Sequence, residues 1–191
     1  MKDKKVLLID GENFRKISDA IFYKELKKEF NPINFDFSNF FDFILADIKP
    51  EKKITYFSKI KYYSQTGGKS KELIKRQRKL RNILYHGGFD FCIAGIVRMQ
   101  KINNKIVFNE KGVDVKIAVD IIKYSLIEKV SQLIICSSDS DLQPAIKESR
   151  NTGTKFIYLG FEEKPNKGLM YTTHQTILIK SKTLFRFYKF K

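Results

Sequence analysis

The chain has 191 residues, and 37 lysines and arginines against 21 aspartates and glutamates give it a net charge of +16 at pH 7. Its composition, 42% hydrophobic and 14% aromatic, supplies enough apolar surface for a folded core and excludes a disordered chain. Two well-separated cysteines and two histidines exclude a disulfide framework and a structural zinc site, and no apolar run is long enough for a membrane span or a secretory signal.

This length predicts a single domain over residues 1–191. The basic surplus indicates a polyanionic partner, nucleic acid first and an anionic membrane second. We expect a cytoplasmic protein.

The first predicted element is a strand over Val6–Ile9, a short continuous apolar run typical of parallel strands covered on both faces. Asp10 follows it directly, and helical spacing over residues 13–29 predicts a helix just beyond. Asp10 would therefore lie at the carboxyl end of a strand, where α/β sheets bind ligands. Asn13 could hold a ligand water or a substrate phosphate from the same turn, or could simply cap the helix.

Eight phenylalanines between Phe14 and Phe43 mark the next segment, and Asn31–Pro32 breaks the first helix. Residues 31–52 are predicted to form a helical insertion. Packing of the aromatic rings onto the sheet is favoured over a surface for stacking bases, because aromatic side chains are mostly core.

A strand over residues 53–58 and a helix over residues 70–85 come next. The loop between them, Thr66-Gly-Gly-Lys-Ser70, looks like a Walker A motif, but that motif needs glycine where Tyr63 stands. This argues against an NTPase. The loop could still hold a backbone phosphate of nucleic acid through its glycine N–H groups and Lys69.

The helix that follows this loop is strongly basic, with Glu72 as its single acid over residues 69–81. The shortage of acidic partners favours contact with phosphates over a merely solvated face. The candidate nucleic-acid-binding residues are Lys69, Lys71, Lys75, Arg76, Arg78, Lys79 and Arg81.

A strand over residues 89–93 precedes a segment, residues 94–110, that reads as a β-hairpin around Asn103–Asn104 and projects from or edges the sheet. The next helix is predicted over residues 113–129, with Asp114 in its first turn. Asp120 lies six residues later, a rotation of about 240°, so the two acids cannot point at one metal ion. We expect Asp120 to be a half-buried partner of a lysine or tyrosine.

The apolar strand Leu133–Cys136 is followed through Ser137–Ser138 by Asp139 and Asp141, at the start of a helix predicted over residues 141–151. A strand over residues 156–159 and a basic, aromatic C-terminal segment over residues 176–191 complete the chain. In its final part, from Lys180 to Lys191, the alternation favours a packed terminal strand, with base stacking by Phe187 or Tyr188 as the alternative.

Strand and helix alternate, so we predict an α/β fold with a mainly parallel central sheet flanked by helices. In that fold Asp10, Asp114, Asp139 and Asp141 converge in one crevice, although each alone would be explained as a helix cap. Carboxylates this close repel unless a cation neutralises them, and hard oxygen ligands favour Mg²⁺ or Mn²⁺. Such ions support hydrolysis of phosphodiester bonds.

Three ordered motifs resemble the NYN domain, a family of the PIN-like, metal-dependent ribonuclease superfamily. They are Leu8-Ile-Asp-Gly-Glu-Asn13, Lys111-Gly-Val-Asp-Val115 with Ala118-Val-Asp120, and Ser137-Ser-Asp-Ser-Asp-Leu-Gln-Pro144. The resemblance covers most of the chain and implies a Rossmann-like PIN fold with an acidic, divalent-metal nuclease site. By position, that site falls on Asp10, Asp114, Asp139 and Asp141, with Asn13 beside Asp10. The family often has glycine where Ser138 stands and phenylalanine where Leu142 stands, and the phenylalanine-rich insertion is longer than expected.

We therefore expect a ribonuclease, an endoribonuclease first, in which Asp10, Asp114, Asp139 and Asp141 hold Mg²⁺ or Mn²⁺ and act in catalysis. Asn13, Asp120 and Ser138 form a second tier of candidates. RNA is the expected partner ahead of DNA, no membrane is involved, and a homodimer remains open. The main alternative is an RNA-binding module of the same fold that does not cut RNA.

Overall fold

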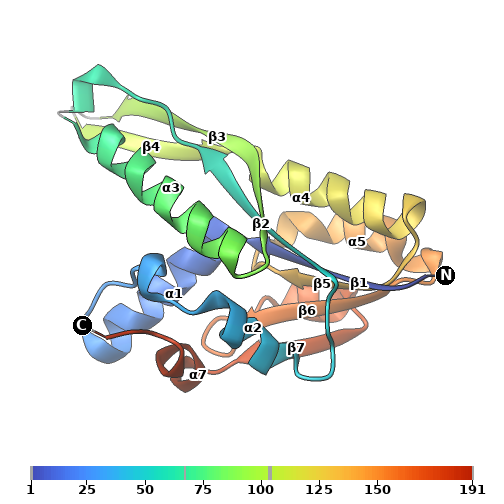
Figure 1. Cartoon of the computed structure of the whole chain (residues 1–191). Coiled ribbons are helices and arrows are strands. Elements are labelled where there is room, and N and C mark those ends of the chain that lie inside the picture. The colour runs from blue at the N-terminus through green and yellow to red at the C-terminus, as the bar shows by residue number, and fades with distance from the viewer. Residues whose placement is uncertain (1, 67, 103–104, 191) are drawn as a thin grey trace.

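The computed structural model describes residues 2–66, 68–102 and 105–190, and within them the centre of the molecule is a seven-stranded sheet (Figure 1). The strand order is β4-β3-β2-β1-β5-β6-β7, and every neighbouring pair is parallel except the antiparallel pair β3 and β4. This confirms the predicted α/β class and mainly parallel sheet. The strands are β1 (Lys2–Asp10), β2 (Lys52–Lys59), β3 (Asp90–Ile102), β4 (Lys105–Lys111), β5 (Val130–Cys136), β6 (Lys155–Phe161) and β7 (Gln175–Ile179).

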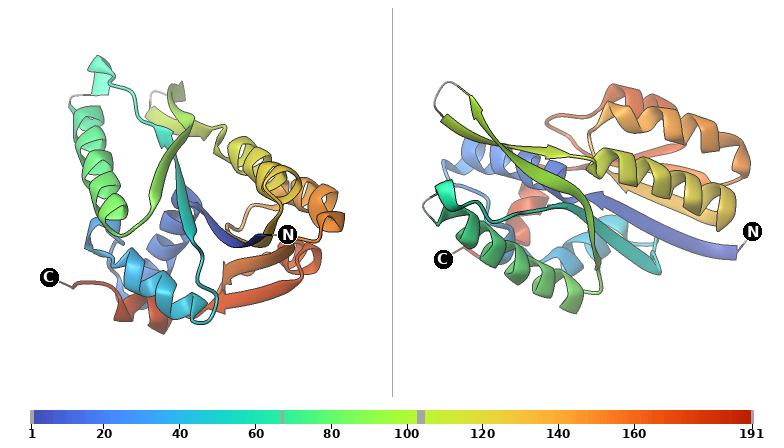
Figure 2. Two further views of the ribbon diagram at one scale, coloured as in Figure 1. Left: turned by 45° about the vertical axis from the view of Figure 1, so that its right-hand side comes forward. Right: turned by 90° about the horizontal axis from the view of Figure 1, so that it is seen from above.

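Helices cover both faces of the sheet (Figures 1 and 2). One face packs against α1, α2, α3 and α7, and the other against α4, α5 and α6. The helices are α1 (Gly11–Leu26), α2 (Phe37–Leu45), α3 (Lys69–His86), α4 (Val113–Ile122), α5 (Gln143–Ser149), α6 (Lys167–Thr172) and α7 (Ser181–Arg186). None of these described helices has both the length and the apolar character that a membrane span requires.

The alternation of side chains along β1 explains why the strand is apolar at each of the four positions from Val6 to Ile9. Leu7 and Ile9 enter the core on the α1 side, whereas Val6 and Leu8 enter the core on the α4 side. A strand covered on both faces gains from apolar residues at each position, so its pattern is continuous rather than alternating. The first polar residue after this run is Asp10, at the exposed edge of the sheet.

The phenylalanine-rich insertion packs as core, as predicted. Phe14 of α1 makes ring contacts with Phe35, Phe37, Phe40 and Phe41 at centroid separations of 5.8–5.9 Å. The insertion contains one α-helix, α2, and a single 3-10 turn at Pro32–Asn34. A cluster of tilted and edge-to-face aromatic rings therefore fastens the insertion to α1.

The predicted hairpin is present, but it is continuous with the strand predicted before it. β3 pairs in parallel with β2 up to Ile96 and then antiparallel with β4 from Ile96 to Ile102. A Cβ atom on Gly95 would lie 2.4 Å from the carbonyl oxygen of Lys111, so only glycine lets the end of β4 approach β3 there. The predicted turn at residues 103–104 lies outside the described residues.

Three other predictions from the sequence need correction. The helix predicted over residues 113–129 is α4 followed by a π-helical turn at Lys123–Ile127, and the one over 141–151 is α5 between two 3-10 turns. The terminal strand was wrong, because residues 181–186 form α7 and the last strand, β7, lies before it. Phe185 of α7 and Tyr188, just beyond the end of α7, pack against the ring of Phe22 in α1 at centroid separations of 5.0 and 4.7 Å.

Candidate active site

Asp10 is the most deeply buried acid at the carboxyl edge of the sheet, with 4% of its surface exposed. Its Oδ1 accepts a hydrogen bond from the backbone N–H of Asn13 at 2.9 Å, which caps α1, and its Oδ2 accepts one from the Ser137 hydroxyl at 3.3 Å. Burial, together with the nearby charges of Asp114 and Glu110, raises the pKa of Asp10 to about 7. The charged groups that shift this carboxyl are both acids.

The loop after β5 carries two of the other predicted acids on a chain of hydrogen bonds that begins at Asp10. The Ser137 hydroxyl that donates to Asp10 accepts from the backbone N–H of Asp139 at 3.1 Å. Asp139 in turn accepts from the N–H of Asp141 at 2.9 Å. Asp10 is buried, Asp139 is half-buried and Asp141 is exposed. The three carboxylates therefore form a series that runs from the interior to the surface.

Asp114 reaches the same edge from the other side of the sheet, in the first turn of α4. Gly112 makes this possible, because it turns the chain from β4 into α4 with φ of +97°, a conformation that residues with a Cβ rarely adopt. Desolvation raises the pKa of Asp114, and the charges of Asp139 and Asp141 and a hydrogen bond with the Asp139 carboxyl raise it as well. Asp114 therefore lies within the electrostatic reach of the other three predicted acids.

Glu110 is an acid at this edge that the sequence analysis missed. It lies near the end of β4, opposite Val97, and burial raises its pKa, as do the charges of Glu12 and Asp114. The Ser58 hydroxyl and Lys16 act in the opposite direction. Its position four residues before Asp114 was the available signal, but a glutamate in a hairpin strand reads as solvent-facing until the strand is known to end at the site.

The four predicted aspartates are thus connected by the effects of their charges on the pKa values of Asp10 and Asp114. The atoms that they offer to a metal ion are all carboxylate oxygens. Such a set suits a hard divalent cation. Burial is the main cause of the raised pKa values of Asp10 and Asp114, and repulsion from the neighbouring acids adds to it. In the described part of the chain, no group of three or more His, Cys, Asp or Glu side chains is already arranged to hold a metal ion.

Asn13 and Ser138, both from the second tier, hold the loop in place. The Asn13 side-chain oxygen accepts from the backbone N–H of Ser138 at 3.1 Å and from its hydroxyl at 3.0 Å. Asn166, which caps α6, donates from its side chain to the Ser138 carbonyl at 2.8 Å. Neither Asn166 nor the Ser137 contact to Asp10 was anticipated, because both depend on segments that are distant in the sequence.

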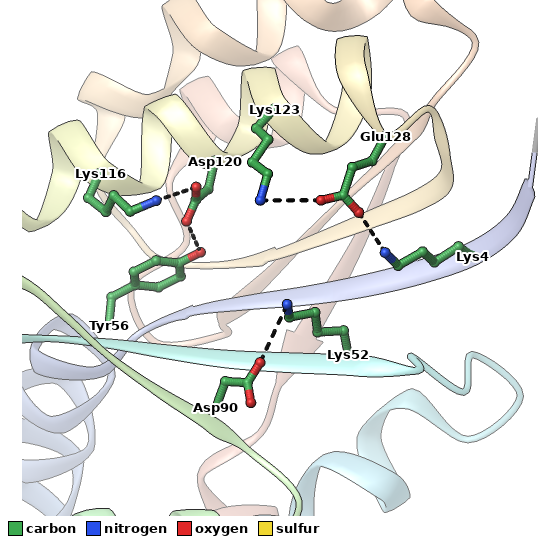
Figure 3. Close-up of polar contacts among 8 residues, drawn as sticks. All are labelled: Lys4, Lys52, Tyr56, Asp90, Lys116, Asp120, Lys123 and Glu128. Carbon is green, nitrogen blue, oxygen red and sulfur yellow. Dashed lines mark hydrogen bonds and ion pairs between the residues drawn. The ribbon is translucent and has the colours of Figure 1, made fainter.

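Asp120 lies away from the cluster, as its helical rotation predicted, and has the expected partners (Figure 3). It is 5% exposed, accepts a hydrogen bond from the Tyr56 hydroxyl at 2.7 Å and forms an ion pair with Lys116. These contacts tie α4 to β2. Figure 3 also shows two ion pairs at the amino ends of the strands: Lys4 of β1 pairs with Glu128, just before β5, and Lys52 of β2 pairs with Asp90 of β3.

The basic helix predicted to contact phosphate is α3, and all seven of its candidate residues are exposed. Arg76 pairs with Glu72 at 2.8 Å, and within the described residues the other six take part in no ion pair. Gln77 donates to the carbonyl of Ser58 at 2.8 Å, which fastens the middle of α3 to the end of β2. Figures 1 and 2 show the first turns of α3 extending from the molecule beside the β3–β4 hairpin.

Comparison with known proteins gives a family and distant structural similarity. The sequence profile described as NYN domain matches residues 4–180. No curated protein matches the chain. A crystal structure of a protein of unknown function from Vibrio parahaemolyticus is similar, with a TM-score of 0.60 and 16% sequence identity over 93% of each chain. At this identity the likeness concerns the fold alone.

Proposed function

Because the chain belongs to the NYN domain family, a PIN-like family of nuclease type, we propose that it is a divalent-metal-dependent ribonuclease that hydrolyses RNA phosphodiester bonds. The observation that carries the proposal is the setting of Asp10. A carboxylate that is 4% exposed, with a pKa raised to about 7 by burial and by two neighbouring acids, lacks the positive charge that a buried acid needs.

In this proposal Asp10, Asp114, Asp139 and Asp141 hold Mg²⁺ or Mn²⁺. When bound, the ion would supply an activated water and would stabilise the charge that develops on the phosphate. The proposal requires the four carboxylates to turn onto the cation, which the exposed and half-buried positions of Asp139, Asp141 and Asp114 allow. Asp10 is held by its two hydrogen bonds and would act as the fixed ligand.

The remaining residues of the site would position the loop and the substrate. Asn13 and Asn166 hold Ser138 from two sides, which keeps Asp139 and Asp141 at the edge of the sheet. The exposed cations of α3 would bind RNA phosphates, since the six that form no ion pair within the described residues have no acid to displace. This division separates binding, on α3, from cleavage, at the acids.

The second candidate function is RNA binding without cleavage, and the same separation favours it, because α3 could bind RNA whether or not the acids hold metal. End-labelled single-stranded and structured RNA, incubated with the protein in Mn²⁺ or in EDTA, distinguishes the two. The proposal predicts shorter products in Mn²⁺ and intact RNA in EDTA. Intact RNA in both, with retardation of the RNA on a native gel, would support the binding module; DNA offered in parallel tests the nucleic-acid class.

A further inference from the structure

A cavity of about 300 Å³ lies against the exposed side of α1, between that helix and the segment that follows β6. Its apolar wall is formed by Ile17, Ala20 and Ile21. Three lysines surround this wall, Lys16 and Lys24 from α1 and Lys164 from the segment after β6. No part of the acidic site lines the cavity.

The charges around the cavity favour an anion. Two acids, Glu25 and Glu163, also line it, so the lining carries three positive charges against two negative ones. Glu25 lies 3.9 Å from Lys24, and Glu163 accepts a hydrogen bond from the backbone N–H of Ser181 at 3.1 Å. Lys16 and Lys164 form no ion pair with any described residue, and both are exposed. Two ammonium groups therefore face an apolar wall from opposite elements.

Two neighbour relations connect the lining of the cavity with the acidic site. Lys16 is close enough to Glu110 to lower the pKa of that acid, and it lies one turn of α1 beyond Asn13. On the other side, Asn166 is two residues beyond Lys164 and donates to Ser138 in the loop that carries Asp139. A chain with a phosphate at the aspartates would meet the cavity next.

We propose that this cavity is a nucleotide subsite for single-stranded RNA, in which a base next to the cleaved bond packs on Ile17, Ala20 and Ile21 while Lys16 and Lys164 contact the adjoining phosphates. The inference rests on the proposed function, which places the scissile phosphate at the acids. The aliphatic side chains of the wall can pack against the face of a base, and the lysines beside them can contact its phosphate. The volume is at the lower limit of small-ligand sites, about 300 Å³, and suits one nucleotide rather than a duplex.

The test measures the affinity of a fluorescein-labelled single-stranded RNA nonamer by anisotropy in EDTA, so that binding is separated from cleavage. Ala20→Phe fills the cavity without changing a charge, and Ala20→Ser is its matched control. Lys16→Gln with Lys164→Gln removes the two cations, and Lys147→Gln with Lys155→Gln removes two exposed lysines outside the cavity. Melting temperatures of all variants report whether they fold.

The proposal predicts that Ala20→Phe weakens binding about tenfold, the effect of losing a stacked base, while Ala20→Ser binds as the unaltered protein does. The Lys16/Lys164 pair should reduce the slope of log affinity against log salt by about 1.4, and the control pair should leave it nearly unchanged. In Mn²⁺, Ala20→Phe should raise KM and leave kcat unchanged.

Affinities within twofold of the unaltered protein for both Ala20→Phe and the Lys16/Lys164 pair would overturn the subsite, even if the protein cleaves RNA normally. If Ala20→Phe fails to fold, the lysine pair decides alone. Absence of cleavage in the unaltered protein, together with weakened binding in these variants, would overturn the proposed ribonuclease and leave the subsite standing.

Discussion

The charge of Asp114, in the first turn of α4, contributes to raising the pKa of Asp10, at the end of β1, although the two residues lie far apart in the sequence. Two acids that disfavour each other's ionised form in this way are unfavourable without a cation. We therefore expect cleavage to depend on a metal ion, stability to depend on pH and RNA binding to depend on surface charge, and the following variants test each expectation.

Asp139→Asn should abolish Mn²⁺-dependent cleavage and leave RNA binding unchanged or slightly tighter. Asparagine keeps the size of the side chain and its ability to accept from the N–H of Asp141, but it removes one charge from the set that would hold the ion. Cleavage is measured with labelled RNA in saturating Mn²⁺ and binding by anisotropy in EDTA.

The matched control for this change is Asp47→Asn, an exposed aspartate in the segment after α2, which should cleave at the unaltered rate. Cleavage by Asp139→Asn at the unaltered rate would exclude Asp139 from an essential role in holding the ion.

Asp10→Asn should remove a pH dependence from the stability of the metal-free protein. The pKa of Asp10 is about 7 when folded and about 3.9 when unfolded, so the folded state binds the proton more tightly. Its contribution to stability is fully present below about pH 4 and is lost as pH rises through about 7. Between pH 5 and pH 8 the free energy of unfolding should fall by roughly 3 kcal/mol more in the unaltered protein than in Asp10→Asn.

Urea unfolding in EDTA at these two pH values measures this difference directly. Equal pH dependence in the two proteins would mean that Asp10 already titrates normally, and the argument for a missing cation would lose its basis.

Lys75→Ala with Arg78→Ala should flatten the salt dependence of RNA binding. Both side chains are exposed on α3 and pair with no acid within the described residues, so each is free to contact a phosphate. The slope of log affinity against log salt should fall by about 0.7 for each lost contact with a single strand. An unchanged slope in anisotropy titrations from low to high salt would show that this face of α3 is only solvated.

Asp120→Ala should destabilise the protein without affecting the site. It leaves the buried Tyr56 hydroxyl without its acceptor and Lys116 without its partner, a loss of about 1–3 kcal/mol. Tyr56→Phe in the same chain should recover part of that loss, because the orphaned hydroxyl is then absent. Mn²⁺-dependent cleavage below the melting transition should stay close to the unaltered rate; a selective loss there would place Asp120 in the site.

The sequence predicted those parts of the protein in which local pattern and global fold agree. Continuous apolar runs identified the buried parallel strands, and the acids that follow β1 and β5 could be placed at one edge because parallel strands end together. The helical rotation between Asp114 and Asp120 separated a site residue from a structural one. Each of these conclusions needed only the spacing of residues along an element and the direction in which the chain runs.

Other features depended on contacts that no local pattern contains. Glu110 reaches the site because Gly95 lets β4 approach β3 closely, and Ser137 is linked to Asp10 across two strands. The end of the chain was taken for a strand because aromatic and basic residues alternate there, whereas residues 181–186 form α7, and Phe185 and Tyr188 pack against Phe22 of α1. The spacing of residues in this short segment fits a strand and a helix equally well, and packing against the rest of the protein decides between them.

The central claim is that Asp10 belongs to a metal-dependent cleavage site, and the rate of cleavage of labelled single-stranded RNA in saturating Mn²⁺, with the unaltered protein and with Asp10→Asn, tests it most directly. We predict cleavage by the unaltered protein that EDTA abolishes, and loss of at least about a hundredfold in rate for Asp10→Asn with its RNA affinity retained. Cleavage by Asp10→Asn at the rate of the unaltered protein, or cleavage that persists in EDTA, would contradict the account.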